Sequence, residues 1–406
     1  MSEARSDFEE ILLLNGHIFL SEAVCDRLAL FKTVNPILKI LKVLGSWPRE
    51  GDQFILRLNF WNGITLFILH FYTAHKFFNW MTVVKYTENV FTAFEQLTLI
   101  TRTAVVAITF DRRFLLQQRI TNLFDAIAEY PLFNVDHKIT KLGRWIKHMI
   151  IGCWSFIALH VILAASLMFY KSTDGYVNWL FYGDAAANTP DIVIRLVMIA
   201  DWALYLFLVI CNECFSLAFY ICLCVIIREK ISDYNDFLTR LQRKNLVTES
   251  SQMQELYKLH SKLTSLVEAL EENFSFPALL WIICIIFNIC VKVEAIISGI
   301  RNSQFEEFGY VLLDIIYYIV SFIMLCFIAS EIGDEKLEPI IAVTKIAQDG
   351  DICDWSFQQE SQLLLSKINE SMMMRLTGWS CFELNKTFMI TILGAIATYT
   401  ILVLQM

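Results

Sequence analysis

The sequence predicts an all-α membrane protein with seven transmembrane helices, and two observations carry this prediction. Of the 406 residues, 56% are hydrophobic and only 18% are charged, which is more apolar than a soluble domain of this size. Apolar stretches long enough to cross about 30 Å of hydrocarbon, which takes roughly 20 helical residues, also recur along the chain. They lie at 54–76, 82–110, 145–170, 191–228, 275–300, 307–331 and 379–405.

Two of these spans are unusual. The second contains Glu88, Glu95 and Arg102, so it is expected to face protein or a water-filled cavity rather than lipid. The fourth, 191–228, would be about 57 Å long as a helix, and its end near Arg228 is expected to project into the cytosol.

The loops between the spans predict the orientation, because cytoplasmic loops retain positive charge. Six Lys and Arg residues lie in each of 1–53, 111–144 and 229–274, and four lie in 332–378. The alternate segments hold only Lys76, Lys171 and Arg301, with Lys85 near the outer surface. We therefore expect a cytosolic N-terminus and an extracellular C-terminus, the opposite of a G-protein-coupled receptor.

Several other classes of protein do not fit the sequence. The net charge of −8 leaves no basic patch for nucleic acid, and most of the 11 cysteines lie within apolar stretches, where a free thiol behaves as a small hydrophobe. No phosphate-binding loop, zinc motif or nucleophile elbow occurs. We expect no enzyme activity, no metal and no cofactor.

The long cytosolic segments predict helices with one apolar stripe. In 253–274 the leucines step by three and four residues, and 355–376 behaves similarly. These stripes consist of Leu256, Leu259, Leu263, Leu266 and Leu270 in the first segment, and of Trp355, Leu364, Ile368 and Met372 in the second. Two interpretations stay open: packing within the chain beneath the membrane, and assembly with other subunits.

The most specific pattern lies at the end of the chain. Gly378, Phe382, Leu384 and Asn385 open it, and Thr398, Tyr399 and Gln405 close it at fixed spacing, with Met406 last. This pattern resembles the signature of insect gustatory receptors, in which Phe usually stands where Met406 does. A weaker family feature is matched before the fifth span by Leu256, His260, Leu263, Val267, Leu270 and Phe274.

The resemblance implies a fold similar to that of insect odorant receptors, forming tetrameric, ligand-gated, poorly selective cation channels. It implies a cytosolic region at 1–53, a six-helix ligand-binding region at 54–331, cytosolic anchor helices at 332–378 and a pore-lining helix at 379–406. The expected partners are a small-molecule tastant, permeating cations, membrane lipid and further subunits of a homo- or hetero-tetramer. The expected location is the plasma membrane of sensory neurons, and a bitter or other non-volatile tastant is favoured over a sugar.

The pore candidates are the residues that share a helix face with Gln405. This face carries Phe388, Thr391, Ala395, Thr398 and Leu402, with Met406 adjacent. Four copies would offer hydroxyls and amides to cations, with a constriction at Leu402 that gates by dewetting. Alternatively, the two threonines bond their own backbone carbonyls or pack between helices.

The ligand candidates are aromatic and charged residues of spans two to six, expected to surround a pocket that opens to the outside. They are Tyr86, Phe94, Glu95, His160, Tyr170, Asp201, Trp202, Tyr205, Lys292, Asp314 and Tyr317. Two alternatives stay open: the aromatic rings can be ordinary core or interface residues, and a pair such as Lys292 and Asp314 can be purely structural. Three rival functions also remain: an odorant-type channel subunit, an inverted seven-span metabotropic receptor, and a transporter, although the internal repeat or broken helices expected of the last are not evident.

Overall fold

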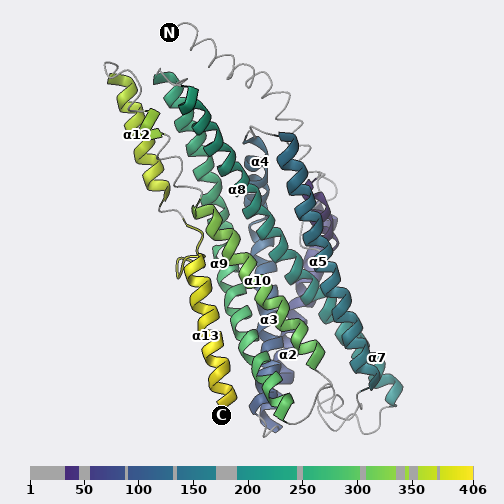
Figure 1. Ribbon diagram of the computed structural model, residues 1–406. Helices are drawn as coiled ribbons and strands as arrows, with labels where there is room; N and C mark the ends of the chain where they lie inside the picture. The colour runs from purple at the N-terminus through teal and green to yellow at the C-terminus, as the bar shows by residue number, and fades with distance from the viewer. Residues whose placement is uncertain are drawn as a thin grey trace.

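The computed structural model describes residues 33–44, 55–86, 90–130, 135–170, 190–244, 250–301, 308–334, 343–346, 355–372 and 375–405. Within these ranges the chain is helical apart from turns and one isolated bridge between Thr377 and Glu383. The helices lie side by side in an elongated bundle (Figure 1). The predicted all-α class is confirmed.

The main helices have the following bounds. They are α2 (Ile55–Tyr86), α3 (Val90–Leu115), α4 (Gln117–Glu129), α5 (Val135–Tyr170), α7 (Asp191–Tyr205), the π-helix η2 (Leu206–Cys211), α8 (Asn212–Lys244), α9 (Ser250–Arg301), α10 (Phe308–Asp334), α12 (Trp355–Met372) and α13 (Lys386–Gln405).

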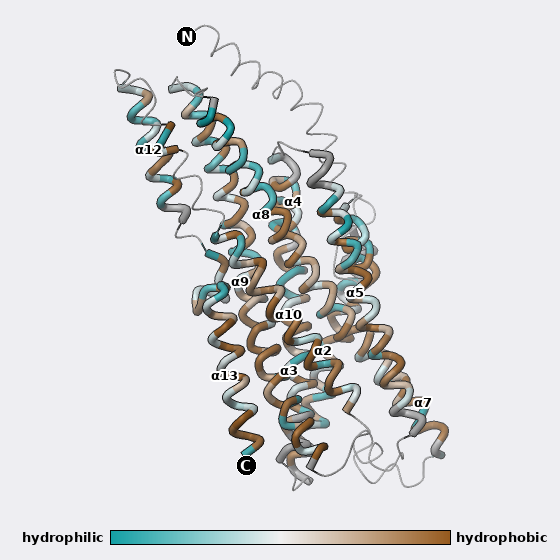
Figure 2. The backbone as a smooth tube through the Cα atoms, in the orientation of Figure 1, coloured by the Kyte–Doolittle hydropathy of each residue, from teal (hydrophilic) through white to brown (hydrophobic). Residues whose placement is uncertain are grey.

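Five helical segments in the described part of the chain are long and apolar enough to cross a membrane, by length and composition. They are Thr140–Ser166, Ile192–Arg243, Ser250–Ile300, Phe308–Asp334 and Lys386–Gln405. The first two predicted spans correspond to α2 and α3, which pack against each other. Figure 2 shows hydrophobic residues dominating α10, α13 and the adjacent half of α9, with more hydrophilic residues around α12.

Two predicted span starts and one predicted loop charge were wrong. The second span begins at Val90 rather than at residue 82, because α2 continues to Tyr86. The last span begins at Lys386 rather than at 379, since a compact turn precedes it. Lys76, counted as an outer-loop charge, lies inside α2 and is buried, with its Nζ 2.8 Å from the Asp201 carboxylate.

The fifth span and the predicted cytosolic helix before it form one continuous helix, α9, with Pro277 inside it. Its predicted leucine stripe is confirmed, because Leu256, Leu263, Leu266 and Leu270 are buried and Leu259 packs against the core. Every residue of the weaker family pattern in this helix is also buried. The stripe therefore serves the interior of this chain.

Helix α12 packs along the N-terminal half of α9. Phe357, Leu364 and Ile368 are buried in this contact, and the Gln254 amide donates to Glu360 at 2.9 Å. Trp355 was expected on the same stripe but is 77% exposed, because Phe357 rather than Trp355 lies one helical repeat from Leu364. Packing within the chain is thus observed, and a role in subunit assembly stays a prediction.

Helix α8 lies at the centre of the bundle, since every residue from Leu208 to Ile227 is buried. Helix α13 is its opposite: it lies at the edge, beside α9 and α10, and none of its residues is buried (Figure 1). The core therefore surrounds α8, and the last helix is free to meet another molecule along most of its circumference.

Candidate functional site

A cluster of charged side chains is buried where α3, α5, α8, α9 and α10 converge. The Arg102 guanidinium, 2% exposed, donates through Nε to the Glu213 carboxylate and through Nη1 to the Tyr205 hydroxyl at 3.3 Å. Both acids near this arginine, Glu213 and Asp314, are themselves buried. A buried ion is costly unless it is paired. Pairing with each other therefore offsets part of the cost of burying Arg102 and Glu213.

Asp314 is surrounded by three nitrogen-bearing side chains, none at hydrogen-bonding distance. Its carboxylate oxygens lie 3.6 Å from Arg102 Nη1, 3.8 Å from Lys292 Nζ and 4.0 Å from His160 Nδ1. A hydrogen bond to nitrogen needs about 2.7–3.2 Å. Arg102 and Lys292 therefore attract the Asp314 carboxylate electrostatically without a direct hydrogen bond to it.

Several polar atoms of this cluster lack a hydrogen-bond partner although they are buried. They are Arg102 Nη2, Asp314 Oδ1, Tyr318 Oη and both ring nitrogens of His160. Each such atom costs roughly 1–3 kcal/mol unless something satisfies it, and native proteins rarely leave several together. Ordered water molecules or the polar groups of a bound ligand would supply the missing hydrogen bonds.

Aromatic rings line the same cluster. The Tyr310 ring lies edge-on to His160 at 4.4 Å between centroids, and Lys292 Nζ lies 5.7 Å from the centre of the Tyr310 ring. The Phe156 and Tyr317 rings stack at 4.3 Å. Apolar walls with a few converging polar groups are the usual chemistry of small-molecule sites.

A π-helical segment, η2, interrupts the long fourth span beside this cluster. It begins directly after Tyr205 and ends at Cys211, two positions before Glu213. Tyr205 and Glu213 are the residues to which Arg102 donates hydrogen bonds. The Asn212 amide at its end donates to the Leu208 carbonyl at 2.9 Å. Single π-turns inside α-helices are frequent at functional sites, and hydropathy could not reveal this one because its residues are apolar throughout.

The structure brings together five of the predicted ligand residues: His160, Tyr205, Lys292, Asp314 and Tyr317. It does not join Asp201 to them, because Asp201 pairs with Lys76, and Trp202 beside it is half-buried. Phe94 is 46% exposed. The side chains of Tyr86, Glu95 and Tyr170 lie outside the described part of the structure.

Two central residues, Arg102 and Glu213, were not among the predicted site residues. A signal was present for both. Arg102 interrupts an apolar span, and Glu213 is the only charged residue between Asp201 and Arg228. An intramembrane charge marks a functional site by default, and here the two partners are 111 positions apart.

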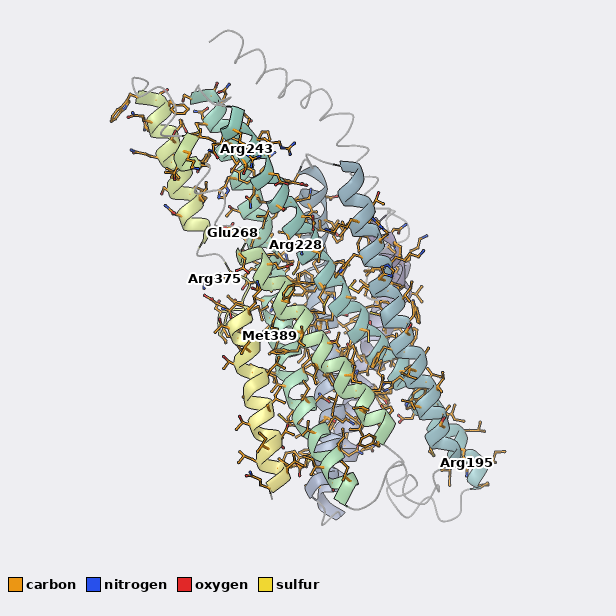
Figure 3. The ribbon with its side chains drawn as sticks, in the orientation of Figure 1. Arg195, Arg228, Arg243, Glu268, Arg375 and Met389 are labelled. Carbon is orange, nitrogen blue, oxygen red and sulfur yellow. The ribbon has the colours of Figure 1, made fainter. Side chains whose placement is uncertain are left out.

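Helix α13 has two different faces. Phe388, Met389, Ile392, Leu393 and Ile396 pack against the core, and Figure 3 labels Met389 near the start of the helix. Most of the predicted pore face points away from the core, because Thr391, Ala395, Thr398, Leu402 and Gln405 are all exposed. Phe388 was wrongly placed on this face, since its ring stacks on Phe382 against the core. Met406 lies outside the described residues.

The threonine hydroxyls of the predicted pore face donate to their own helix. Thr391 Oγ1 donates to the Thr387 carbonyl and Thr398 Oγ1 to the Gly394 carbonyl, each at 2.9 Å. This was the alternative interpretation of both residues. Each hydroxyl oxygen can still accept a further bond, so the contact does not exclude a pore surface.

The opening part of the family pattern forms a compact turn, 375–385, between α12 and α13. The turn closes through Gly378 N–H, which donates to the Phe382 carbonyl at 2.9 Å, and through left-handed backbone at Trp379 and Ser380. The Phe382 ring stacks on Phe388 at 4.4 Å. The Asn385 side chain then caps α13 by accepting from Phe388 N–H at 2.7 Å.

This turn is fastened to α9. The Glu271 carboxylate accepts bonds from the backbone N–H of Thr377 at 2.9 Å and from its hydroxyl. Trp379 N–H donates to the Ser275 carbonyl at 3.1 Å. Further along, the Tyr399 hydroxyl lies 3.4 Å from the Glu294 carboxylate, so α9 holds the last helix at two levels.

Replacing Gly378 by alanine is expected to destabilise this turn by about 1–3 kcal/mol, the usual cost of overpacking. An added Cβ would come within 2.5 Å of the Phe382 ring, which cannot retreat because it stacks on Phe388. Thermal unfolding of the purified protein measures the effect. Gly152→Ala is the matched control, because nothing lies within 4 Å of a Cβ there; an equal fall in both variants would contradict the packing argument.

Comparison with known proteins identifies the family. The model described as "7tm Chemosensory receptor" matches residues 34–406. The chain belongs to this family. The predicted membership of the insect chemoreceptor superfamily is thereby confirmed. The protein is a multi-pass membrane receptor.

Solved structures agree with this assignment. The receptor is similar to the insect olfactory receptor OR5 from Machilis hrabei, with a TM-score of 0.74 and 14% identity over 94% of this chain and 99% of that one. The complex of OR5 with eugenol gives a TM-score of 0.71 at the same identity and coverage. None of the curated proteins searched matches the receptor. At this identity the likeness establishes the fold alone.

Proposed function

We propose that the receptor is a subunit of a gustatory, ligand-gated, non-selective cation channel. The observation that carries the proposal is the exposed face of α13, on which Thr391, Thr398, Leu402 and Gln405 point away from the core. In a tetramer of the kind that the family resemblance implies, this face lines the pore. It carries no carboxylate, so strong calcium selectivity is not expected.

The ligand site in this proposal is the buried charged cluster. Arg102 and Lys292 balance Glu213 and Asp314, so a neutral small molecule can enter without leaving a net charge in the membrane. The unsatisfied atoms around Asp314 supply orientation, and the aromatic rings supply affinity. A bitter or other non-volatile tastant remains favoured over a sugar.

Ligand binding opens the channel only if the site fits the open state better than the closed state. Lys292 of the cluster and Glu294, which contacts Tyr399, lie within one turn of α9. A ligand that draws Lys292 toward or away from Asp314 therefore acts on the helix that holds α13. In this proposal the subunit works in the plasma membrane of sensory neurons, within a homo- or hetero-tetramer.

The test is expression of the receptor alone in a heterologous cell, with whole-cell current recorded against sugars, bitter compounds and eugenol. We expect a ligand-evoked cation current that persists when G-protein signalling is blocked. A C-terminal epitope tag should stain in intact cells, as the predicted orientation requires. Surface expression with a second-messenger response but no such current would favour the metabotropic alternative.

The likeness to OR5 favours an odorant-type channel subunit as a second candidate. The same recording separates the two, since currents evoked by eugenol but by no sugar or bitter compound would support it.

A further inference from the structure

Helix α5 carries a row of basic side chains near its N-terminal end. Lys141, Arg144, Lys147 and His148 are all exposed. Steps of three and four residues put them on one side of the helix. None of the four forms an ion pair with a described residue.

The same side of α5 becomes apolar immediately beyond His148. Ile151 is 50% exposed, and Leu159 and Ile162 follow at 44% and 61%. Trp154 stands at the start of this apolar stretch, 48% exposed, where tryptophan in membrane proteins marks the interface between headgroups and hydrocarbon. The helix side thus changes from cationic to lipid-compatible within one turn.

The opposite side of α5 is occupied by the protein itself. Leu142, Ile146, Ile157 and His160 are buried there, against α8 and α10. In Figure 1, α5 and α13 lie on opposite sides of the bundle. If α13 faces the pore axis, the basic row faces the surrounding bilayer.

We propose that Lys141, Arg144 and Lys147 form a binding site for the anionic headgroups of phospholipids in the leaflet at this end of α5. Basic side chains just outside a transmembrane segment attract acidic lipids, and their aliphatic stems lie along the apolar surface while the charges reach phosphate. Loop charges predict that this end is cytosolic, which is the leaflet that carries acidic lipid in animal plasma membranes. None of these three residues belongs to the candidate ligand site or to the predicted pore face of α13.

The experiment uses the full-length receptor in nanodiscs of phosphatidylcholine with about 20% phosphatidylserine, followed by native mass spectrometry of retained lipids. We expect the wild type to retain phosphatidylserine in preference to phosphatidylcholine. The triple variant K141Q/R144Q/K147Q should lose at least about tenfold of this preference, because each basic side chain contributes roughly fivefold. The charge-conserving variant K141R/K147R should keep it.

The matched control is R240Q/R243Q/K262Q, which removes three exposed positive charges from the hydrophilic ends of α8 and α9. Figure 3 shows Arg243 at the end of α8. The control should retain phosphatidylserine like the wild type. The proposal is overturned if the triple variant keeps its preference, or if the control loses as much. Thermal unfolding of each variant shows that the fold is intact.

Discussion

Replacing Leu402 by serine is expected to raise the current that flows without ligand by about tenfold or more. Leu402 is 55% exposed near the C-terminal end of α13 and shares its face with Thr398 and Gln405. Four such side chains around an axis would form an apolar constriction, which stays closed because water does not wet it. A hydroxyl in each subunit lets water and ions enter. Whole-cell current in the absence of any tastant measures this.

Leu404→Ser is the matched control for this experiment. Leu404 is 58% exposed at the same level of α13 but lies about 160–200° away around the helix, two residues on. It should leave the resting current unchanged. Equal leak in both variants, or normal surface expression of Leu402→Ser without leak, would remove the constriction from this face.

Replacing Tyr318 by phenylalanine is expected to reduce ligand potency roughly tenfold without reducing stability. The Tyr318 hydroxyl is buried without a hydrogen-bond partner, so its removal relieves a desolvated group and leaves the ring in place. If a ligand supplies the missing partner, that bond is lost with the hydroxyl. The half-maximal concentration of whichever compound evokes current measures the change, and thermal unfolding measures stability.

Asp314→Asn should also reduce ligand potency at the candidate ligand site, by a larger factor of about 10- to 100-fold. It removes the carboxylate that Arg102, Lys292 and His160 surround, and it leaves two cations partly uncompensated, so surface expression must be measured beside it. Asp201→Asn is its control, because Asp201 pairs with Lys76 outside the cluster. Altered ion permeability with unchanged potency for Tyr318→Phe and Asp314→Asn would move both residues out of the ligand site.

The helical class and most span positions could be predicted because hydrocarbon thickness imposes one length and one composition on any crossing helix. Boundaries failed where that constraint ends. Lys76 looked like a loop residue because its partner, Asp201, lies 125 positions away. The start of α13 was misplaced because the turn that Gly378 and Phe382 close also contains apolar residues, such as Cys381 and Leu384, directly before the helix.

In the candidate site, too, single residues could be predicted from the sequence, but their contacts with distant residues could not. His160, Lys292 and Asp314 could be proposed one by one, since each is a polar group within an apolar stretch. That Arg102 lies beside Asp314 and pairs with Glu213 depends on how α3 packs against the other helices. It also depends on the π-turn at Leu206–Cys211, which shifts every later side chain of the fourth span around its axis. Neither property is local in sequence.

The unbroken α9 has a mechanical consequence. At 52 residues it is a rod about 78 Å long, which touches α12 near one end and Tyr399 near the other. A tilt of about 3° around its middle displaces each tip by roughly 2 Å in opposite directions, comparable to the helix shifts of allosteric transitions. The α12 end and the Tyr399 end of α9 are thus two arms of one lever, and a tilt that displaces one end displaces the other.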